Sequence, residues 1–188
     1  MKKTPILLIL LLSLSFSLNS QTVNFGIQSD GTFKNVIDGK TFVVIERDGK
    51  SQSELYSEIL IAITRLYNSP KDVISKVENE VISVNGISED CVTQNLSMGM
   101  KNIYSIQYIL QFQFKDGKIR VEAPVVSRFF THNNPDVKPF SGWLNVQNIF
   151  KKGMPNPKKQ NTIDDFNNTF NDIINNIISN KVSNDEDW

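Results

Sequence analysis

A strict alternation of apolar and polar residues marks the segment from residue 104 to residue 114. The even positions are large and apolar, and the odd positions are polar except for Ile109. Such alternation predicts a β-strand with one buried and one solvated face. The pair Asp116-Gly117 follows this segment, and it favours a two-residue hairpin turn that requires positive φ at both positions. We therefore expect an antiparallel hairpin over residues 104–123.

A two-residue turn fixes the register of this hairpin. Each apolar residue then faces an apolar partner and each polar residue a polar one, whereas a slip by one residue would destroy the match. The expected pairs are Lys115–Lys118, Phe114–Ile119, Gln113–Arg120, Phe112–Val121, Gln111–Glu122 and Leu110–Ala123.

Two segments carry the period of an amphipathic helix. The first, residues 52–67, begins behind a capping box formed by Ser51 and Glu54. The second runs to residue 178 behind Asn161 or Thr162 as its cap. Its Asn and Ile residues are mediocre helix formers, so we expect its apolar stripe to pack on a sheet, with a self-pairing coiled coil as the alternative. This stripe consists of Ile163, Phe166, Phe170, Ile173, Ile174, Ile177 and Ile178.

Short β-branched or aromatic runs predict further strands at residues 41–45, 73–76 and 81–84. Asn85-Gly86 has the composition of a turn. Residues 87–102 show no periodicity that favours either a helix or a strand.

Segments without clear periodicity frame these elements. Residues 21–40 are a polar N-terminal lead-in, in which residues 32–37 have strand character. Residues 129–161 contain four prolines and predict a long loop over the domain. Residues 183–188 form an acidic tail. The apolar anchors of the loop are Phe140, Trp143 and Phe150.

The elements follow the order β-α-β4-α. Helices must bury their apolar stripes, and the sheet offers one apolar face for them. We therefore expect the α+β class, with an antiparallel sheet packed by two helices on one face. Residues 41–182 would form this single domain.

The first residues have the pattern of a secretory signal peptide. Lys2 and Lys3 precede an apolar run, and the chain turns polar at Asn19. We expect cleavage near Ser20, before Gln21, and a periplasmic or secreted protein without a stable membrane anchor afterwards. An uncleaved anchor or a buried helix is the alternative, although a spanning helix needs about 20 apolar residues.

Charge and cysteine content narrow the function classes. The chain has 20 basic and 20 acidic residues, so no overall charge draws it to nucleic acid, and we expect no nucleic-acid partner. Its one cysteine, Cys91, cannot form a disulfide within the chain. A small buried side chain and an intermolecular disulfide are the two interpretations.

No catalytic motif, cofactor motif or metal-ligand set emerges from the sequence. His132 is the single histidine, so a multi-histidine zinc site is excluded. A solvated loop position explains it better than a Cys91–His132 dyad does. We expect no cofactor and assign no catalytic residue. Solvated or helix-capping roles explain the carboxylate pairs Glu78/Glu80, Glu89/Asp90 and Asp164/Asp165.

The candidate binding surface is the polar face of the hairpin, together with Trp143. Trp143 is interpreted either as a ring that stacks on a sugar or as a loop anchor. Four lysines at residues 151–159 are either solvated or a docking patch for an acidic glycan or partner. The polar face comprises Gln107, Gln111, Gln113, Arg120 and Glu122.

Three stretches resemble an uncharacterised family of secreted bacterial domains of unknown function with a fold like the TATA-binding protein. They are TFVVIERDGKSQSELYSEILIAI, YNSPKDVISKVENEVISVNG and YSIQYILQFQFKDGKIRVE. The resemblance extends from Thr41 to Phe129 and implies the order β-α-β4-α. It supplies no catalytic residue, and likeness to a DNA-binding fold is not evidence of DNA binding.

Two functional hypotheses follow. The first is an exported, non-catalytic binding or assembly module of the bacterial cell envelope, with an envelope protein or a glycan as its partner. The alternative is a small envelope enzyme, a carboxylate-based hydrolase. A pocket that holds two carboxylates of raised pKa would favour the enzyme.

Overall fold

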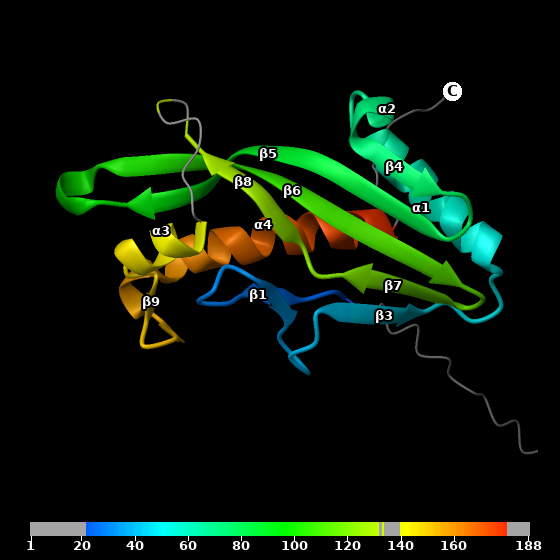
Figure 1. The fold of residues 1–188 in the computed structure, drawn as a ribbon, viewed down its shortest axis with the longest axis horizontal. Coiled ribbons are helices and arrows are strands. Elements are labelled where there is room, and N and C mark those ends of the chain that lie inside the picture. Colours follow the sequence, from blue (N-terminus) through cyan, green and yellow to red (C-terminus); the bar gives the residue numbers. More distant parts are fainter. Residues whose placement is uncertain (1–21, 132, 134–139, 180–188) are drawn as a thin grey trace, which may run out of the picture.

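The computed structural model describes residues 22–131, 133 and 140–179. The expected signal peptide, His132 and the acidic tail lie outside the described residues. At the centre is a six-stranded antiparallel sheet of order β3-β7-β6-β5-β4, with β8 also paired to β6 (Figure 1). Its strands are β3 (Phe42–Glu46), β4 (Ile74–Val77), β5 (Val81–Asn95), β6 (Lys101–Lys115), β7 (Lys118–Glu122) and β8 (Val125–Phe130).

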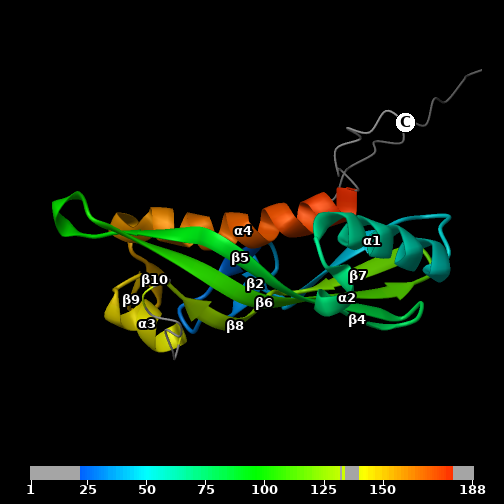
Figure 2. The same ribbon diagram turned by 90° about the horizontal axis from the view of Figure 1, so that it is seen from above.

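Two long helices, α1 (Gln52–Leu66) and α4 (Gln160–Ser179), lie on one side of this sheet (Figure 2). The expected class, an α+β fold with two helices on one face of an antiparallel sheet, is confirmed. The apolar stripe of α4 packs into the core rather than onto a second helix of its own kind. A four-residue helix, α2 (Pro70–Val73), precedes β4. None of the helices among the described residues has the length and apolar character needed to cross a bilayer.

The caps of the two long helices differ in how well the sequence predicts them. The capping box before α1 is present, with Ser51 and Glu54 each bonding the other's backbone N–H. The predicted cap of α4 is wrong, because the helix begins at Gln160, directly after the 3-10 turn η2 (Pro157–Lys159). Thr162 Oγ1 instead donates to the carbonyl of Thr93, at 3.0 Å, and so ties α4 to β5.

The predicted hairpin register holds from the turn to the pair Phe112↔Val121. Beyond that pair the prediction is wrong, since Gln111–Glu122 and Leu110–Ala123 are absent from the observed register of β6 and β7. The Ala123 N–H bonds the carbonyl of Thr41 instead, at 2.8 Å, and Pro124 has no N–H to donate. Pairing with β6 resumes in β8, where Ile109 faces Val125.

The turn predicted at Asn85-Gly86 is also wrong, because both residues lie inside β5. A Cβ at Gly86 would approach the Tyr108 ring to 2.7 Å. Glycine is therefore needed here for close packing between neighbouring strands and not for a turn. The unassigned residues 87–102 continue β5, form the 3-10 turn η1 (Ser97–Gly99) and begin β6.

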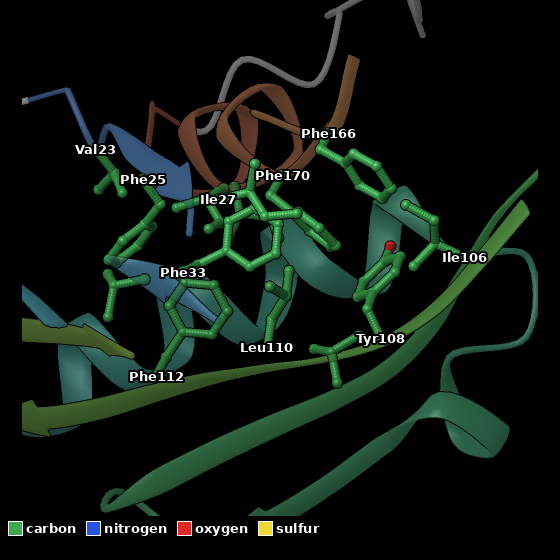
Figure 3. Packing of buried hydrophobic residues seen from close by; sticks show 14 of the residues in the cluster. Val23, Phe25, Ile27, Phe33, Ile106, Tyr108, Leu110, Phe112, Phe166 and Phe170 are labelled. Carbon is green, nitrogen blue, oxygen red and sulfur yellow. The ribbon is translucent and has the colours of Figure 1, made fainter. Parts of the chain in front are cut away.

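The expected lead-in is part of the core. It contains a hairpin of two strands, β1 (Phe25–Ile27) and β2 (Phe33–Asn35). β2 lies within residues 32–37, where strand character was expected, whereas β1 was not expected. Figure 3 shows Phe25, Ile27 and Phe33 packed between Phe170 of α4 and the β6 residues Leu110 and Phe112. The apolar residues Val23, Phe25 and Ile27 recur at every second position and are buried, and in β2 the exposed Lys34 separates the buried Phe33 and Asn35.

Three asparagines attach β1 to α4. Asn167, Asn171 and Asn175 accept hydrogen bonds from the backbone N–H groups of Ile27, Phe25 and Val23, each at 2.8 Å. Four helical residues rise about 6 Å, and two strand residues span about 6.7 Å. The two repeats nearly match, so the asparagine side chains accept hydrogen bonds from successive backbone N–H groups along the edge of β1, as a neighbouring strand would.

The long loop expected over residues 129–161 is only partly irregular. β8 continues to Phe130, and the segment then contains α3 (Phe140–Val146), β9 (Phe150–Lys151) and β10 (Met154–Pro155). The prolines do not prevent these short elements, because Pro155 lies at the end of β10 and Pro157 begins η2. The expected order β-α-β4-α is not reproduced exactly. Its members correspond to β3, α1, β4 to β7 and α4, and the structure adds β1 and β2, the short helix α2, the turn η1, and the elements between β7 and α4.

Candidate functional site

The five polar residues expected on the sheet surface do share one face. In β6, Gln107, Gln111 and Gln113 alternate with buried residues, and Gln113 lies opposite Arg120 of β7. Exposed apolar side chains flank them on the same face, among them Val44, Ile109 and Val125. We call this surface the open face; it comprises Val44, Gln107, Ile109, Gln111, Gln113, Arg120, Glu122 and Val125.

Charges on the open face are paired with one another. Glu122 Oε1 lies 2.6 Å from Arg120 Nε and accepts a hydrogen bond of 3.2 Å from Gln113 Nε2. The Arg120 guanidinium carbon lies 3.9 Å from the centroid of the Phe42 ring, within cation–π range. This set orders the side chains of the open face while leaving them partly accessible to a partner.

A groove of about 670 Å³ opens beside this face. It lies at the step where pairing with β6 ends after Val121 and resumes at Val125. The turn between β1 and β2 and the start of α3 form the other walls. The lining residues are Asp30, Gly31, Thr32, Phe33, Thr41, Gln111, Glu122, Ala123, Pro124, Val125, Val126, Phe140 and Ser141.

The groove contains two carboxylates, Asp30 and Glu122. The Thr32 hydroxyl and backbone N–H donate to Asp30 Oδ1 at 2.7 and 2.9 Å. These hydrogen bonds, the hydroxyl first, lower the pKa of Asp30 below its ordinary value. Because Asp30 is ionised at neutral pH and Glu122 is paired with Arg120, both carboxylates serve as acceptors for hydrogen-bond donors.

Trp143 lies apart from the open face and is only 8% exposed. Its ring packs edge-on against Tyr104, with 5.0 Å between centroids, and contacts Phe129 at 4.7 Å. The interpretation as a loop anchor is therefore correct, and Trp143 is not available to stack on a sugar. The remaining five candidates are brought together by the sheet.

Cys91 lies in an irregular part of β5 and is half-buried. Its thiol donates to the carbonyl of Ser88 at 3.3 Å, and burial raises the pKa of the thiol. A thiol of raised pKa is a poor nucleophile near neutral pH. This agrees with a packing role for Cys91, and the alternative dyad involves His132, outside the described residues.

The sequence did not indicate Asp30, Thr41, Phe140 or Pro124 as groove residues. They come from segments far apart in the chain, and only the docking of the β1–β2 turn beside α3 brings them together. A local signal existed for the turn alone: Asp30-Gly31 is a turn dipeptide. Gly31 has φ of 84°, and a Cβ there would lie 3.1 Å from Phe140 Cδ1.

The chain is similar to one protein family and to two solved structures. Residues 42–127 match the family model described as "Domain of unknown function (DUF4468) with TBP-like fold". No curated protein matches the chain. A DUF4468 family protein from Bacteroides ovatus is 15% identical over 74% of this chain and 78% of its own, with a TM-score of 0.45. A TBP-like protein from Parabacteroides distasonis is 16% identical over 74% of this chain and 91% of its own, with a TM-score of 0.43.

Proposed function

Residues 42–127 match the model of the DUF4468 family, whose description gives an unknown function and a TBP-like fold, and we propose that the chain is an exported, non-catalytic binding module of the bacterial cell envelope. It takes its partner on the open face of the sheet and in the adjoining groove. The proposal is based on the continuity of the open face with the groove, because Gln111 and Glu122 belong to both surfaces. Export rests on the N-terminal pattern of the sequence.

The chemistry of the open face suits a partner that lies flat across the strands. Its glutamine side chains offer both donors and acceptors, and exposed aliphatic side chains lie beside them. A surface of this mixed composition resembles protein interfaces, which combine apolar contacts with hydrogen bonds.

The groove adds an acceptor-rich recess. Asp30 and Glu122 present carboxylate oxygens, and Phe140 contributes a half-buried ring. A volume of about 670 Å³ falls within the range of sites for small ligands. Such a recess suits a segment rich in hydrogen-bond donors, either the N–H groups of an envelope protein or the hydroxyls of a glycan.

The alternative of a carboxylate-based hydrolase gains no support from the groove. A glycoside hydrolase needs a carboxylic acid that stays protonated near neutral pH. In Asp30 the hydrogen bonds from Thr32 act in the opposite direction and lower the pKa. The same carboxylates remain suited to binding.

A crosslinking pull-down from the native envelope tests the proposal. The exported chain should capture the same partner repeatedly, and Arg120→Glu should weaken that capture, because reversal leaves Glu122 beside a like charge. Glu58→Lys on α1 is a matched charge reversal on the helical side. A screen on immobilised glycans covers the second class of partner.

The two variants separate a specific surface from general adhesion. Capture that survives Arg120→Glu, or that Glu58→Lys weakens equally, would contradict the open face as the binding surface. Hydrolysis of a glycan substrate by the wild-type chain would instead establish the enzyme alternative.

A further inference from the structure

The hairpin of β5 and β6 projects as an arm from one end of the molecule (Figure 1, Figure 2). Its turn, residues 96–100, is here called the arm tip. The tip is closed by its own backbone, since the Leu96 N–H donates to the Met100 carbonyl at 2.9 Å and the Met100 N–H donates to the Ser97 carbonyl at 3.3 Å. Three of its five residues are nevertheless apolar: Leu96, Met98 and Met100.

These apolar side chains are exposed to solvent. Met98 is 95% exposed, Met100 is 56% exposed and Leu96 is 36% exposed. Met98 also has φ of 58°, a conformation in which asparagine, aspartate or glycine would be expected. The turn therefore holds the Met98 side chain in solvent. A cluster of exposed apolar side chains on a protruding element is a candidate contact site.

The same end of the molecule carries several lysines, together with Asp165 of α4, whose carboxylate accepts from the Thr93 N–H at 2.7 Å. The sequence has no aspartate or glutamate between residues 91 and 115, or between residues 137 and 163. Lys101 lies opposite Asn95 at the base of the tip, and Lys159 Nζ donates to the Asn95 carbonyl at 3.1 Å. Lys151, Lys152 and Lys158 lie in the β9–β10 hairpin and η2, and Figure 1 shows β9 at the same end of the molecule as the arm.

We propose that the arm tip inserts into the interface of a lipid bilayer that carries anionic phospholipid. Met98 enters the boundary between headgroups and acyl chains, with Met100 and Leu96 beside it. The lysines at the base of the tip lie level with the phosphate groups. Contact of this kind is peripheral and reversible, because one short apolar turn and a cluster of lysines supply two modest signals that act together.

Two features favour a bilayer over other occupants. The unbranched thioether side chain of methionine adapts to an irregular, fluid environment, and the tip is convex, whereas a partner protein would need a matching cavity. An anionic polysaccharide would engage the lysines but leave Met98 in water. This inference goes beyond the proposed function, because the arm tip is separate from the open face and its groove.

Vesicle flotation tests the proposal with the chain from residue 21 onward, which contains every described residue. Wild-type protein should float with phosphatidylcholine vesicles that contain phosphatidylglycerol, and not with pure phosphatidylcholine, and added salt should release it. Met98→Asp should weaken binding by about tenfold or more. Aspartate tolerates the left-handed conformation, so this variant keeps the turn.

Ile37→Asp is the matched control, because Ile37 is 82% exposed in a different turn. It should float like the wild type, whereas Lys101→Gln combined with Lys152→Gln should reduce binding and its salt dependence. A dye that reports polarity, attached to Met98→Cys in a Cys91→Ser background, should shift to the blue on vesicle addition.

Four results would overturn the proposal. They are an absence of flotation with anionic vesicles, flotation that Met98→Asp leaves unchanged, binding without a blue shift, and a tip-dependent doubling of mass in solution. Displacement of the protein from vesicles by a soluble anionic polysaccharide, with Met98→Asp still binding that polymer at full strength, would assign the lysines to a glycan instead.

Discussion

Replacing Asn171 with alanine should loosen the N-terminal hairpin from the rest of the fold. Asn171 Oδ1 accepts from the Phe25 N–H at 2.8 Å, and its Nδ2 donates to the Phe25 carbonyl at 3.0 Å. Phe25 itself is 0% exposed. The side chain thus serves both backbone groups of a buried strand residue, and alanine would leave each without this partner.

The expected cost follows from these two hydrogen bonds. Each contributes about 1 kcal/mol net, and a buried backbone group left unpaired costs about 1–3 kcal/mol. Alanine favours the helix over asparagine by up to about 0.7 kcal/mol, which offsets part of the loss. We therefore expect Asn171→Ala to lower the free energy of unfolding by about 2–3 kcal/mol.

Urea unfolding measures this difference, and hydrogen exchange locates it. Asn168→Ala, at an exposed position on the same helix, is the control and should leave stability unchanged or raise it by up to about 0.7 kcal/mol through helix propensity. In Asn171→Ala the amides of residues 23–27 should exchange faster than those of β6. Equal stability of the two variants, or unchanged exchange in β1, would refute the asparagine attachment.

Three further predictions concern local features. Gly86→Ala should destabilise the fold by about 1–3 kcal/mol in thermal unfolding, because a Cβ there would lie 2.7 Å from the Tyr108 ring; an unchanged midpoint would contradict the close packing. Ser51→Ala should cost about 1 kcal/mol through loss of the helix cap, as chemical unfolding would measure, and an unchanged midpoint would rule out the capping box. Hydrogen bonds from Ser51, the hydroxyl first, lower the pKa of Glu54, so this carboxylate adds stability above its ordinary pKa that is lost as the pH falls through the lowered value. Glu54→Gln should therefore flatten the acid limb of the stability profile, and an identical limb would contradict the assignment.

Patterns of short range were sufficient to predict most of the sheet and both long helices. The hairpin register followed from alternation plus one turn dipeptide, and the cap of α1 followed from Ser51 and Glu54. Both signals lie within a few residues of the structure that they determine. The register prediction failed where a distant residue intervened, since the Thr41 carbonyl captures the Ala123 N–H.

Features that depend on distant segments were beyond sequence reasoning. The role of the N-terminal hairpin depends on asparagines about 140–150 positions away, and asparagine on a helix ordinarily indicates a solvated face. Asn85-Gly86 has the composition of a turn, and the approach of the Tyr108 ring to Gly86 leaves no local trace in the sequence.

The candidate site divides in the same way. Alternation along one strand placed three glutamines on a common face, and the hairpin turn added Arg120 and Glu122. The groove beside them was not predictable, because its walls come from β2, α3 and the step after β7. Residue type alone does not distinguish a sugar-stacking Trp143 from a packing anchor, and the ring cluster around Phe129 buries it.

Site-specific photocrosslinking in the native envelope tests the central claim most directly. A photoreactive residue at Gln111 lies on the open face and lines the groove, and one at Ser57 lies exposed on α1. We expect the photoreactive residue at position 111 to capture a discrete partner and the one at position 57 to capture none. Capture at Ser57 alone, or equal capture at both positions, would contradict the open face as the binding surface.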